Sequence, residues 1–264
     1  MVSRAQKTPT VPALDKALNI LEVLAESRLG LSFPELVQRT GLAKSSVHCL
    51  LITLERRGYI HRHARTGRYM FGTRLFSLAN TSIMGLTLRE QAAPRLLGLA
   101  ERTHLTVHMA ILERGEAVLV AKYEPTGAPR LATWIGKRME VHCTGLGKAM
   151  LAYLPDETVL GIIKEHGMPR HNENTICSSK RLLDDLELSA QRGYALDDEE
   201  DEIGLRCVGT PIREPGGEVL AAISVAGTTA QIPRESVVPL SRELNETAVK
   251  ILAAMTAQAH AAAK

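Results

Sequence analysis

Hydrophobic residues near the start of the chain recur every three or four positions, from Leu14 to Leu24. This spacing places them on one face, so the pattern predicts an amphipathic helix. The later segment SFPE fits a capping box, in which Ser32 caps a second helix and Glu35 reaches back to it. Pro34 stands in the first turn, where a missing N–H has no cost. We expect this second helix to be short and to end at the next glycine.

A third helix is predicted from Ala43 to Arg57, followed by Gly58 as a left-handed end. Its buried stripe is expected to consist of Val47, Leu50, Leu51 and Leu54. Two strand-like pieces follow around Thr66-Gly67, which predicts a β-hairpin. Two helices joined by a tight turn with glycine, then a basic hairpin, are typical of a winged helix-turn-helix.

The polar face of the third helix and the hairpin carry candidate DNA contacts. Short polar side chains near a helix N-terminus can approach base edges and phosphates in the major groove. Arginines on a hairpin suit phosphates or a minor groove. The candidates are Lys44, Ser45, Ser46, His48 and Cys49 on the helix, and Arg62, Arg65 and Arg68 on the hairpin. The alternative is a small helical bundle with a solvated basic face.

The distribution of charge favours the DNA interpretation. Residues 1–79 contain twelve Lys/Arg and five Asp/Glu, a net charge of +7, whereas the rest of the chain carries −4. A basic first part on an acidic body indicates a polyanion partner for the first part only. Double-stranded DNA is therefore the expected partner.

The stretch from Leu75 to Leu99 has a helical pattern, with a break expected near Gly85 and a new helix beginning at Pro94. We expect residues 75–90 to form a linker helix between two domains. This stretch also offers a surface for a second copy of the chain. DNA-binding proteins of this kind commonly dimerise so that their symmetry matches that of the operator.

From Leu105 onward the pattern changes to strands with flanking helices. Two strands are expected around Arg114-Gly115, and further strands in YALDD, RCVGTPIRE and EVLAAISVAG. Helices are expected in HCTGLGKAMLAYL, DETVLGIIKEHG and SSKRLLDDLELSAQRG, and in a last helix interrupted at Pro239. This grouping favours an α+β fold with an antiparallel sheet.

Length and composition set the domain organisation. A chain of 264 residues suggests about two domains. We expect a disordered arm at 1–11, a winged helix-turn-helix at 12–74, the linker at 75–90 and a second domain at 91–260. No apolar run approaches the ~20 residues of a membrane helix, and no signal peptide is evident. The four cysteines stand singly, as is typical of reduced thiols, so we expect a cytoplasmic protein.

Four segments occur in a specific order: RTGLAKSSVHCLLITLERRGYI, HCTGLGKAMLAYL, GYALDDEEDEIGLRC and AAISVAG. With them the chain resembles the isocitrate lyase regulator (IclR) family of bacterial transcription factors over nearly its whole length. The resemblance implies a winged helix-turn-helix followed by a GAF-like effector-binding domain, and a homodimer or homotetramer. It also implies that a small organic molecule switches DNA binding. We therefore expect a repressor of a catabolic operon.

The resemblance also assigns an effector site. Matched by motif position, Gly145, Leu146, Asp197, Cys207 and Ser224 fall at the polar contacts, and Ala128, Leu131, Met139 and Leu205 fall at the apolar walls. A ligand carboxylate is expected at the helix start, which offers unpaired N–H groups, and Asp197 is expected to accept a hydrogen bond from the ligand. A small organic acid is the expected effector. Without the resemblance, the glycines here fit a plain helix start that needs close packing.

Two positions depart from the family pattern. Ala226 stands where some relatives with small keto-acid ligands have a second serine, which puts that ligand class in doubt. Cys49 stands on the third helix where an arginine is frequent, which removes an expected phosphate or base contact. The operator is then expected to differ, or the hairpin to compensate.

The acidic run DDEEDE at residues 197–202 divides into two parts on this interpretation. Asp197, at a strand end, is the candidate ligand contact. Asp198 to Glu202 are expected to form a solvated loop, in which like charges avoid each other in water, and all five are expected to be replaceable.

Three alternatives remain. In an enzyme, Cys207 would be the nucleophile with a histidine as base, but no local motif pairs the two. A metal could use His142, Cys143, His166, His171 and Cys177, yet their spacings match no zinc pattern, and the acidic run is not a calcium loop. We expect neither catalysis, nor a metal, nor another cofactor. In the third alternative the second domain only oligomerises and senses nothing.

Overall fold

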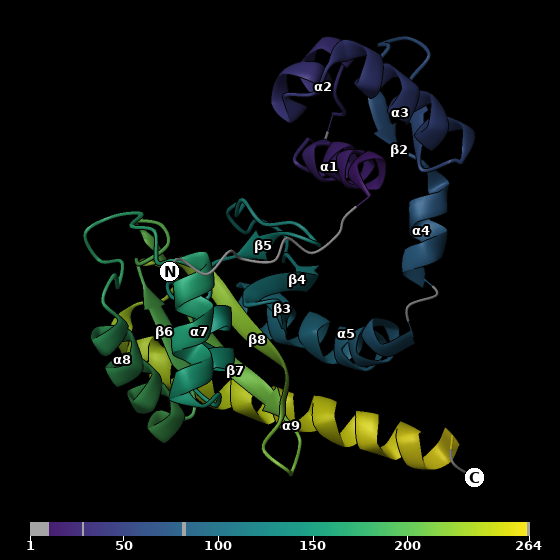
Figure 1. Ribbon diagram of the computed structural model, residues 1–264. Helices are drawn as coiled ribbons and strands as arrows, with labels where there is room; N and C mark the ends of the chain where they lie inside the picture. Colours follow the sequence, from purple (N-terminus) through teal and green to yellow (C-terminus); the bar gives the residue numbers. More distant parts are fainter. Residues whose placement is uncertain (1–10, 28, 81–82, 263–264) are drawn as a thin grey trace. The chain divides into compact units, whose positions relative to one another are not determined.

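The computed structural model of the protein, shown in Figure 1, describes residues 11–27, 29–80 and 83–262. Contacts divide the chain into two units, with the boundary between Ile83 and Met84. The expected arm at residues 1–11 lies, except for Val11, outside the described residues.

The first unit consists of helices followed by a short hairpin. Its elements are α1 (Pro12–Ala25), α2 (Phe33–Thr40), α3 (Lys44–Arg56), β1 (Ile60–Arg62), β2 (Tyr69–Phe71) and α4 (Thr73–Asn80). The core includes Ile20, Leu24, Leu36, Val47, Leu51, Leu54 and Ile60. Antiparallel pairing of β1 with β2 forms the wing, with Ile60 opposite Phe71. The expected winged helix-turn-helix is confirmed.

Local sequence signals explain the helix boundaries of this unit. The capping box of α2 is present, with the Ser32 N–H donating to Glu35 Oε2 at 2.7 Å. Gly41 ends this helix with φ +65°, and Gly58 follows α3 with φ +75°, both left-handed conformations that favour glycine.

The predicted apolar face of α1 is partly wrong. Ile20 and Leu24 are buried, whereas Leu14 is 58% and Leu18 is 48% exposed. The buried face is centred on positions 20 and 24, so the first turns of the helix do not reach the core of the unit.

The second unit is built on a six-stranded antiparallel sheet with the strand order β5-β4-β3-β8-β7-β6. The strands are β3 (Thr106–Glu113), β4 (Glu116–Tyr123), β5 (Arg138–Met139), β6 (Ala195–Asp198), β7 (Leu205–Arg213) and β8 (Val219–Thr228). The helices are α5 (Ile83–Thr103), α6 (Gly145–Leu151), α7 (Asp156–His166), α8 (Ser179–Arg192) and α9 (Val237–Ala262), the last preceded by the 3-10 turn η1 (Arg234–Ser236). The expected α+β fold is confirmed.

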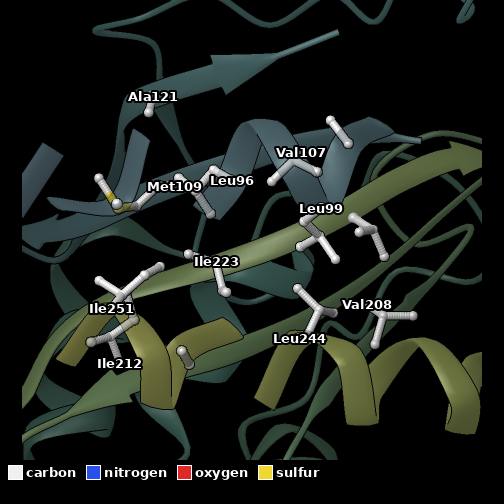
Figure 2. Close-up of a cluster of buried hydrophobic side chains, with 14 of the residues drawn as sticks. Leu96, Leu99, Val107, Met109, Ala121, Val208, Ile212, Ile223, Leu244 and Ile251 are labelled. Atoms are coloured by element: carbon white, nitrogen blue, oxygen red, sulfur yellow. The ribbon is translucent and has the colours of Figure 1, made fainter. Parts of the chain in front are cut away.

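Helices cover both faces of the sheet. Because side chains alternate along a strand, Met109 and Ile223 point to one face while Ala110 and Ala222 point to the other. Figure 2 shows the first face, where residues of α5 and α9 pack on the strands, among them Leu96, Leu99, Leu244 and Ile251. The opposite face packs against α6, α7 and α8. The start of α6 thus packs directly on strands of the sheet.

Two prolines do not interrupt helices as expected. Pro94 lies inside α5 and does not begin a new helix. The break expected near Gly85 agrees with the boundaries, since α4 ends at Asn80 and α5 begins at Ile83. Leu88, Ala92, Leu96 and Leu99 are buried on both sides of Pro94, and this packing offsets the one lost hydrogen bond. Pro239 lies in the first turn of α9, where no intrahelical N–H bond is required.

The connection between the units contains the end of α4 and the start of α5, and residues 81–82 between them lie outside the described residues. Strand β5 was not expected from the sequence pattern. Among the described helices, none combines the length and apolarity needed to cross a membrane.

Candidate functional site

The predicted helix contacts for DNA lie on the outer face of α3. Lys44, Ser45, His48 and Cys49 are exposed, and Ser46 is half-buried. The His48 ring packs edge-on against Phe33, with 6.3 Å between ring centroids. Within the described ranges, Lys44 has no ion-pair partner, so its ammonium group is available to a phosphate.

The three wing arginines differ in their surroundings. Arg65 is exposed, and its guanidinium has no partner among the residues that the structure describes. Arg62 donates from Nε to the Gly67 carbonyl at 3.1 Å and lies over the Tyr69 ring. Its exposed side chain still faces solvent.

The predicted phosphate contact at Arg68 is not supported by its geometry. Its Nε donates to the Gly30 carbonyl at 3.0 Å, and a terminal nitrogen bonds Glu35 Oε1 at 2.9 Å. Hydrogen bonds from Ser32, followed by those of Arg68, lower the pKa of Glu35 to about 2. Arg68 therefore joins the wing to the start of α2.

Separate substitutions distinguish the two arginines. Arg65→Ala should weaken binding to DNA of any sequence and reduce the slope of log K against log salt by about 1. Arg68→Ala should leave that slope unchanged and slightly lower the melting temperature, because it removes the hydrogen bonds that join the wing to the start of α2. Fluorescence anisotropy at several salt concentrations and calorimetry measure both. Equal changes in slope would contradict the structural role of Arg68.

The second unit contains a pocket between the start of α6 and the strand ends of the sheet. It encloses a cavity of about 70 Å³ that opens to solvent. Of the nine residues predicted for the effector site, eight line it: Leu131, Met139, Gly145, Leu146, Asp197, Leu205, Cys207 and Ser224. Ala128 does not line it, and lies half-buried in the segment between β4 and β5.

Strand pairing explains why these residues converge. Asp197 on β6 lies opposite Cys207 on β7, and Cys207 lies opposite Ala226 on β8. Ser224, two positions before Ala226, lies opposite His108 on β3. Neighbouring strands thus place these side chains in one row on the face that α6 covers.

Several lining residues were not predicted as contacts: His108, Ala132, Thr133, Lys137, Thr144, Asp201, Glu202 and Ala226. His108 lies on β3. Its alternation within β3 gave a signal, since it shares a face with Ala110, but only the strand register shows that it faces Ser224.

The glycines at the start of α6 serve packing. A Cβ on Gly145 would lie 3.2 Å from the Cys207 carbonyl oxygen, and one on Gly147 would lie 2.3 Å from the Cα of Val141. Gly145 lines the pocket, but the space left by its missing side chain is filled by β7. These distances support close packing as a reason for the two glycines, and the ligand contact at Gly145 stays a prediction.

Ser224 presents an unused hydroxyl to the pocket. Its side chain is buried, and within the described part of the chain no residue hydrogen-bonds it. The backbone N–H groups of Gly145 and Leu146 also have no hydrogen-bond acceptor among the described residues. Lys137 brings a positive charge to the same pocket. These groups could bind a ligand with hydrogen-bond acceptors and negative charge.

Asp197 has a role within the protein in addition to its place in the pocket wall. Its Oδ1 accepts from the N–H groups of Glu200 and Asp201, at 2.9 and 3.4 Å. Burial raises the pKa of Asp197 to about 7, although the Glu200 N–H bond opposes this. Asp197 therefore shapes the turn that follows β6, where Glu199 has φ +64°.

The expectation of a solvated loop at Asp198–Glu202 is wrong for several of its members. Asp198 pairs with Arg206 and Arg234, and Glu199 Oε2 accepts from the Gly204 N–H at 2.8 Å. Glu200 is 6% exposed and forms an ion pair with Lys148. Basic partners elsewhere in the chain thus offset the charge of two of the five acids, whereas Asp201 and Glu202 are exposed, as expected.

Lys148 on α6 is fully buried and holds this loop. Its Nζ lies 2.5 Å from Glu200 Oε1 and 2.9 Å from Asp185 Oδ2 on α8. Burial alone would lower the pKa of Lys148, but the two carboxylates outweigh burial and raise it. The lysine is charged and joins α6, α8 and the acidic loop.

His108 is held neutral in the pocket wall. Burial, with Lys122 and Lys137 nearby, lowers the pKa of His108 from 6.5 to about 3. Its Nε2 lies 2.9 Å from Thr133 Oγ1, which fixes the ring.

This shift makes stability depend on pH. Below pH 6.5 the unfolded chain binds a proton at His108, whereas the folded chain does not. The free energy of unfolding therefore falls as the pH drops from 6.5 toward 3. His108→Gln, which does not titrate, should show a shallower loss than the wild type in urea unfolding between about pH 5 and 7. Parallel curves would contradict a buried, neutral His108.

The pocket does not have the chemistry of a cysteine hydrolase. Burial and the nearby Asp197 carboxylate raise the pKa of the Cys207 thiol well above its ordinary value. A nucleophilic cysteine requires the opposite shift. His108 shares the pocket but bonds Thr133, so the geometry favours binding over covalent catalysis.

Sequence comparison matches both units to models of one family. Residues 13–64 match the IclR helix-turn-helix domain, and residues 80–253 match the bacterial transcriptional regulator IclR C-terminal domain. The chain is also similar to the transcriptional repressor IclR of Escherichia coli strain K12. The two are 32% identical over 238 residues, which cover 89% of this chain and 87% of that protein.

Solved structures share the architecture of the whole chain. The IclR of Thermotoga maritima is 27% identical with a TM-score of 0.74, covering 92% of this chain and 98% of that one. An IclR homolog from Microbacterium hydrocarbonoxydans, complexed with 4-hydroxybenzoate, has a TM-score of 0.83 at 24% identity, covering 93% and 99%. At that identity the second match supports the fold alone.

Proposed function

Because the chain belongs to the IclR family of DNA-binding transcriptional regulators, which are not enzymes, we propose that it represses a catabolic operon and that a small organic acid controls its affinity for DNA. The similar Escherichia coli protein is named a repressor, which supports repression rather than activation. The C-terminal domain is the family's effector-binding part, and the acid occupies the pocket beside α6.

The observation that carries the ligand class is the unused polar surface of the pocket. The free hydroxyl of Ser224 and the N–H groups of Gly145 and Leu146 suit a carboxylate. Lys137, whose Nζ donates to the Ala132 carbonyl at 2.8 Å, adds positive charge to the pocket wall. Leu131, Met139, Leu146 and Leu205 provide apolar walls. Asp197 can accept a hydrogen bond from a hydroxyl on the ligand.

A homodimer or homotetramer belongs to the same proposal. Operators read by a helix-turn-helix commonly contain two half-sites related by symmetry, and a two-fold symmetric protein matches them. Light scattering of the protein with an operator fragment measures the number of chains bound.

The ligand is tested by melting curves with a panel of small organic acids that includes 4-hydroxybenzoate. An effector at a hundred times its dissociation constant should stabilise the protein by ~2.7 kcal/mol and change binding to DNA upstream of neighbouring catabolic genes. Ser224→Ala should weaken the effector about tenfold, the cost of one lost hydrogen bond.

Ser179→Ala, at an exposed serine of α8, is the matched control and should bind the effector normally. If Ser224→Ala also binds it normally, the ligand lies elsewhere. If no acid changes melting or DNA binding, the alternative of a non-sensing, oligomerising domain gains support.

A further inference from the structure

Three loops of the second unit converge beside the pocket with four metal-ligating side chains. Glu140 and Cys143 lie between β5 and α6, His171 between α7 and α8, and Asp201 between β6 and β7. One donor atom from each lies within 4.8 Å of all the others. The set combines a thiol, an imidazole and two carboxylates.

The thiol of this cluster is buried and unused. Cys143 is 0% exposed, and within the described ranges no residue hydrogen-bonds its Sγ. Its sulfur nevertheless points into the cluster, close to the other three donors. A buried thiol without a hydrogen bond is ordinary when its neighbours are apolar, but this one faces an imidazole and two carboxylates, a surrounding that suits a metal ligand.

The two carboxylates have no basic partner of the kind that stabilises the neighbouring acids. In the described part of the chain, neither Glu140 nor Asp201 pairs with a lysine or arginine, and the ion-pair contact of Glu140 is His171 Nε2 at 3.9 Å. By contrast, Asp198 and Glu200 each pair with a lysine or arginine. Negative charge is therefore concentrated at one point without an offsetting cation.

Hydrogen bonds hold the three loops in place. Thr144 Oγ1 donates to the Glu140 carbonyl at 2.6 Å. Thr175 Oγ1 accepts from the His171 N–H at 3.2 Å and donates to the Glu200 carbonyl at 2.8 Å, which ties the second loop to the third. The donors are thus positioned by folded backbone.

We propose that Glu140, Cys143, His171 and Asp201 bind one Zn²⁺ ion. Thiolate, imidazole and carboxylate are the ligands that zinc takes in tetrahedral sites, and a thiolate disfavours Mg²⁺ and Ca²⁺, which take oxygen ligands. Zinc bonds of about 2.0–2.3 Å place donors ~3.3–3.8 Å apart. The exposed side chains of Glu140, His171 and Asp201 therefore rotate toward the buried thiol, which loses its proton to solvent.

The ion joins three loops, two of which continue into residues that line the effector pocket. Asp201 both ligates the metal and lines the pocket, so zinc fixes one wall of it. Sequence spacing did not reveal the site because its donors come from three separate loops, and only two of them are near neighbours. The zinc proposal does not rest on the proposed effector, and zinc binding can be measured without effector or DNA.

The experiment uses full-length, untagged protein dialysed against a chelator and then against buffered Zn²⁺ or Mg²⁺. The wild type should retain one zinc per chain by mass spectrometry of metals and no magnesium. Co²⁺ in place of Zn²⁺ should give a thiolate-to-cobalt charge-transfer band. His171→Ala and Cys143→Ser should each raise the zinc dissociation constant at least about 100-fold, more than the loss of an outer-shell partner costs, and Cys143→Ser should abolish the cobalt band.

His166→Ala and Cys177→Ser, at an exposed histidine and an exposed cysteine outside the cluster, are the matched controls and should retain zinc. Circular dichroism shows whether each variant folds. Because His171 is exposed, His171→Ala is expected to fold and still tests the site if the buried substitution Cys143→Ser prevents folding. A wild type without zinc, or equal retention by His171→Ala and His166→Ala, overturns the site. Neither result affects the DNA or effector measurements.

Discussion

Lys148→Met should lower the free energy of unfolding by about 3–5 kcal/mol, the cost of removing one partner from a buried ion pair. The lysine is 0% exposed and lies 2.5 Å from Glu200 Oε1 and 2.9 Å from Asp185 Oδ2. Methionine keeps most of the volume but leaves the Glu200 carboxylate buried without a cation. Urea unfolding followed by circular dichroism measures the loss.

Two further variants show whether charge is the cause. Lys180→Met, at an exposed lysine on α8, should change stability by no more than ~0.5 kcal/mol. Adding Glu200→Gln to Lys148→Met removes the unpaired carboxylate and should recover part of the loss. If Lys148→Met is no worse than Lys180→Met, the ion pair does not hold the acidic loop.

Features of the fold that depend on neighbouring residues could be predicted from the sequence. The capping box at Ser32, the third helix and the hairpin turn are each encoded within a few neighbouring residues. They were predicted with only small differences in their boundaries. The register of the six-stranded sheet depends on contacts between distant segments, so the alternation of residues gave strands but not their neighbours.

The pocket was predicted through motif order, not through physical reasoning. Strand alternation alone placed Ser224 with Ala226, but it did not show that Cys207 and Asp197 continue the row. Ala128 was assigned by the same motif matching and does not line the pocket. Motif matching therefore selected eight residues that line one pocket, and the structure shows which other side chains line it.

The acidic run and Arg68 show why local charge patterns misled the prediction. Glu200 was predicted to be one of five solvated acids, yet its partner Lys148 lies 52 residues earlier in the chain. Arg68 seemed a phosphate contact, yet its partner Glu35 lies 33 residues earlier. In both cases a distant charge of opposite sign decides the role, and no window of the sequence contains both partners.

Gly209→Ala should be among the most destabilising single substitutions in the second unit, at about 3 kcal/mol, the upper end of typical overpacking costs. Gly209 lies on β7 opposite Ser224. A Cβ there would lie 2.2 Å from the carbonyl oxygen and 2.6 Å from the carbonyl carbon of Gly145. Both atoms are backbone, so no side-chain rotation relieves the clash, and the start of α6 must move away from the sheet.

Gly216→Ala is the matched control, because a Cβ at Gly216 meets nothing within 4 Å and no left-handed φ is required there. It should change the unfolding free energy by no more than ~0.5 kcal/mol. Since Gly145 and Leu146 line the pocket, Gly209→Ala should also weaken effector binding at temperatures where the protein remains folded. DNA binding by the first unit should persist there, because the clash lies entirely within the second unit. Equal stability of the two variants would mean that α6 does not pack against β7 through its glycines, and the geometry assigned to the pocket would then be wrong.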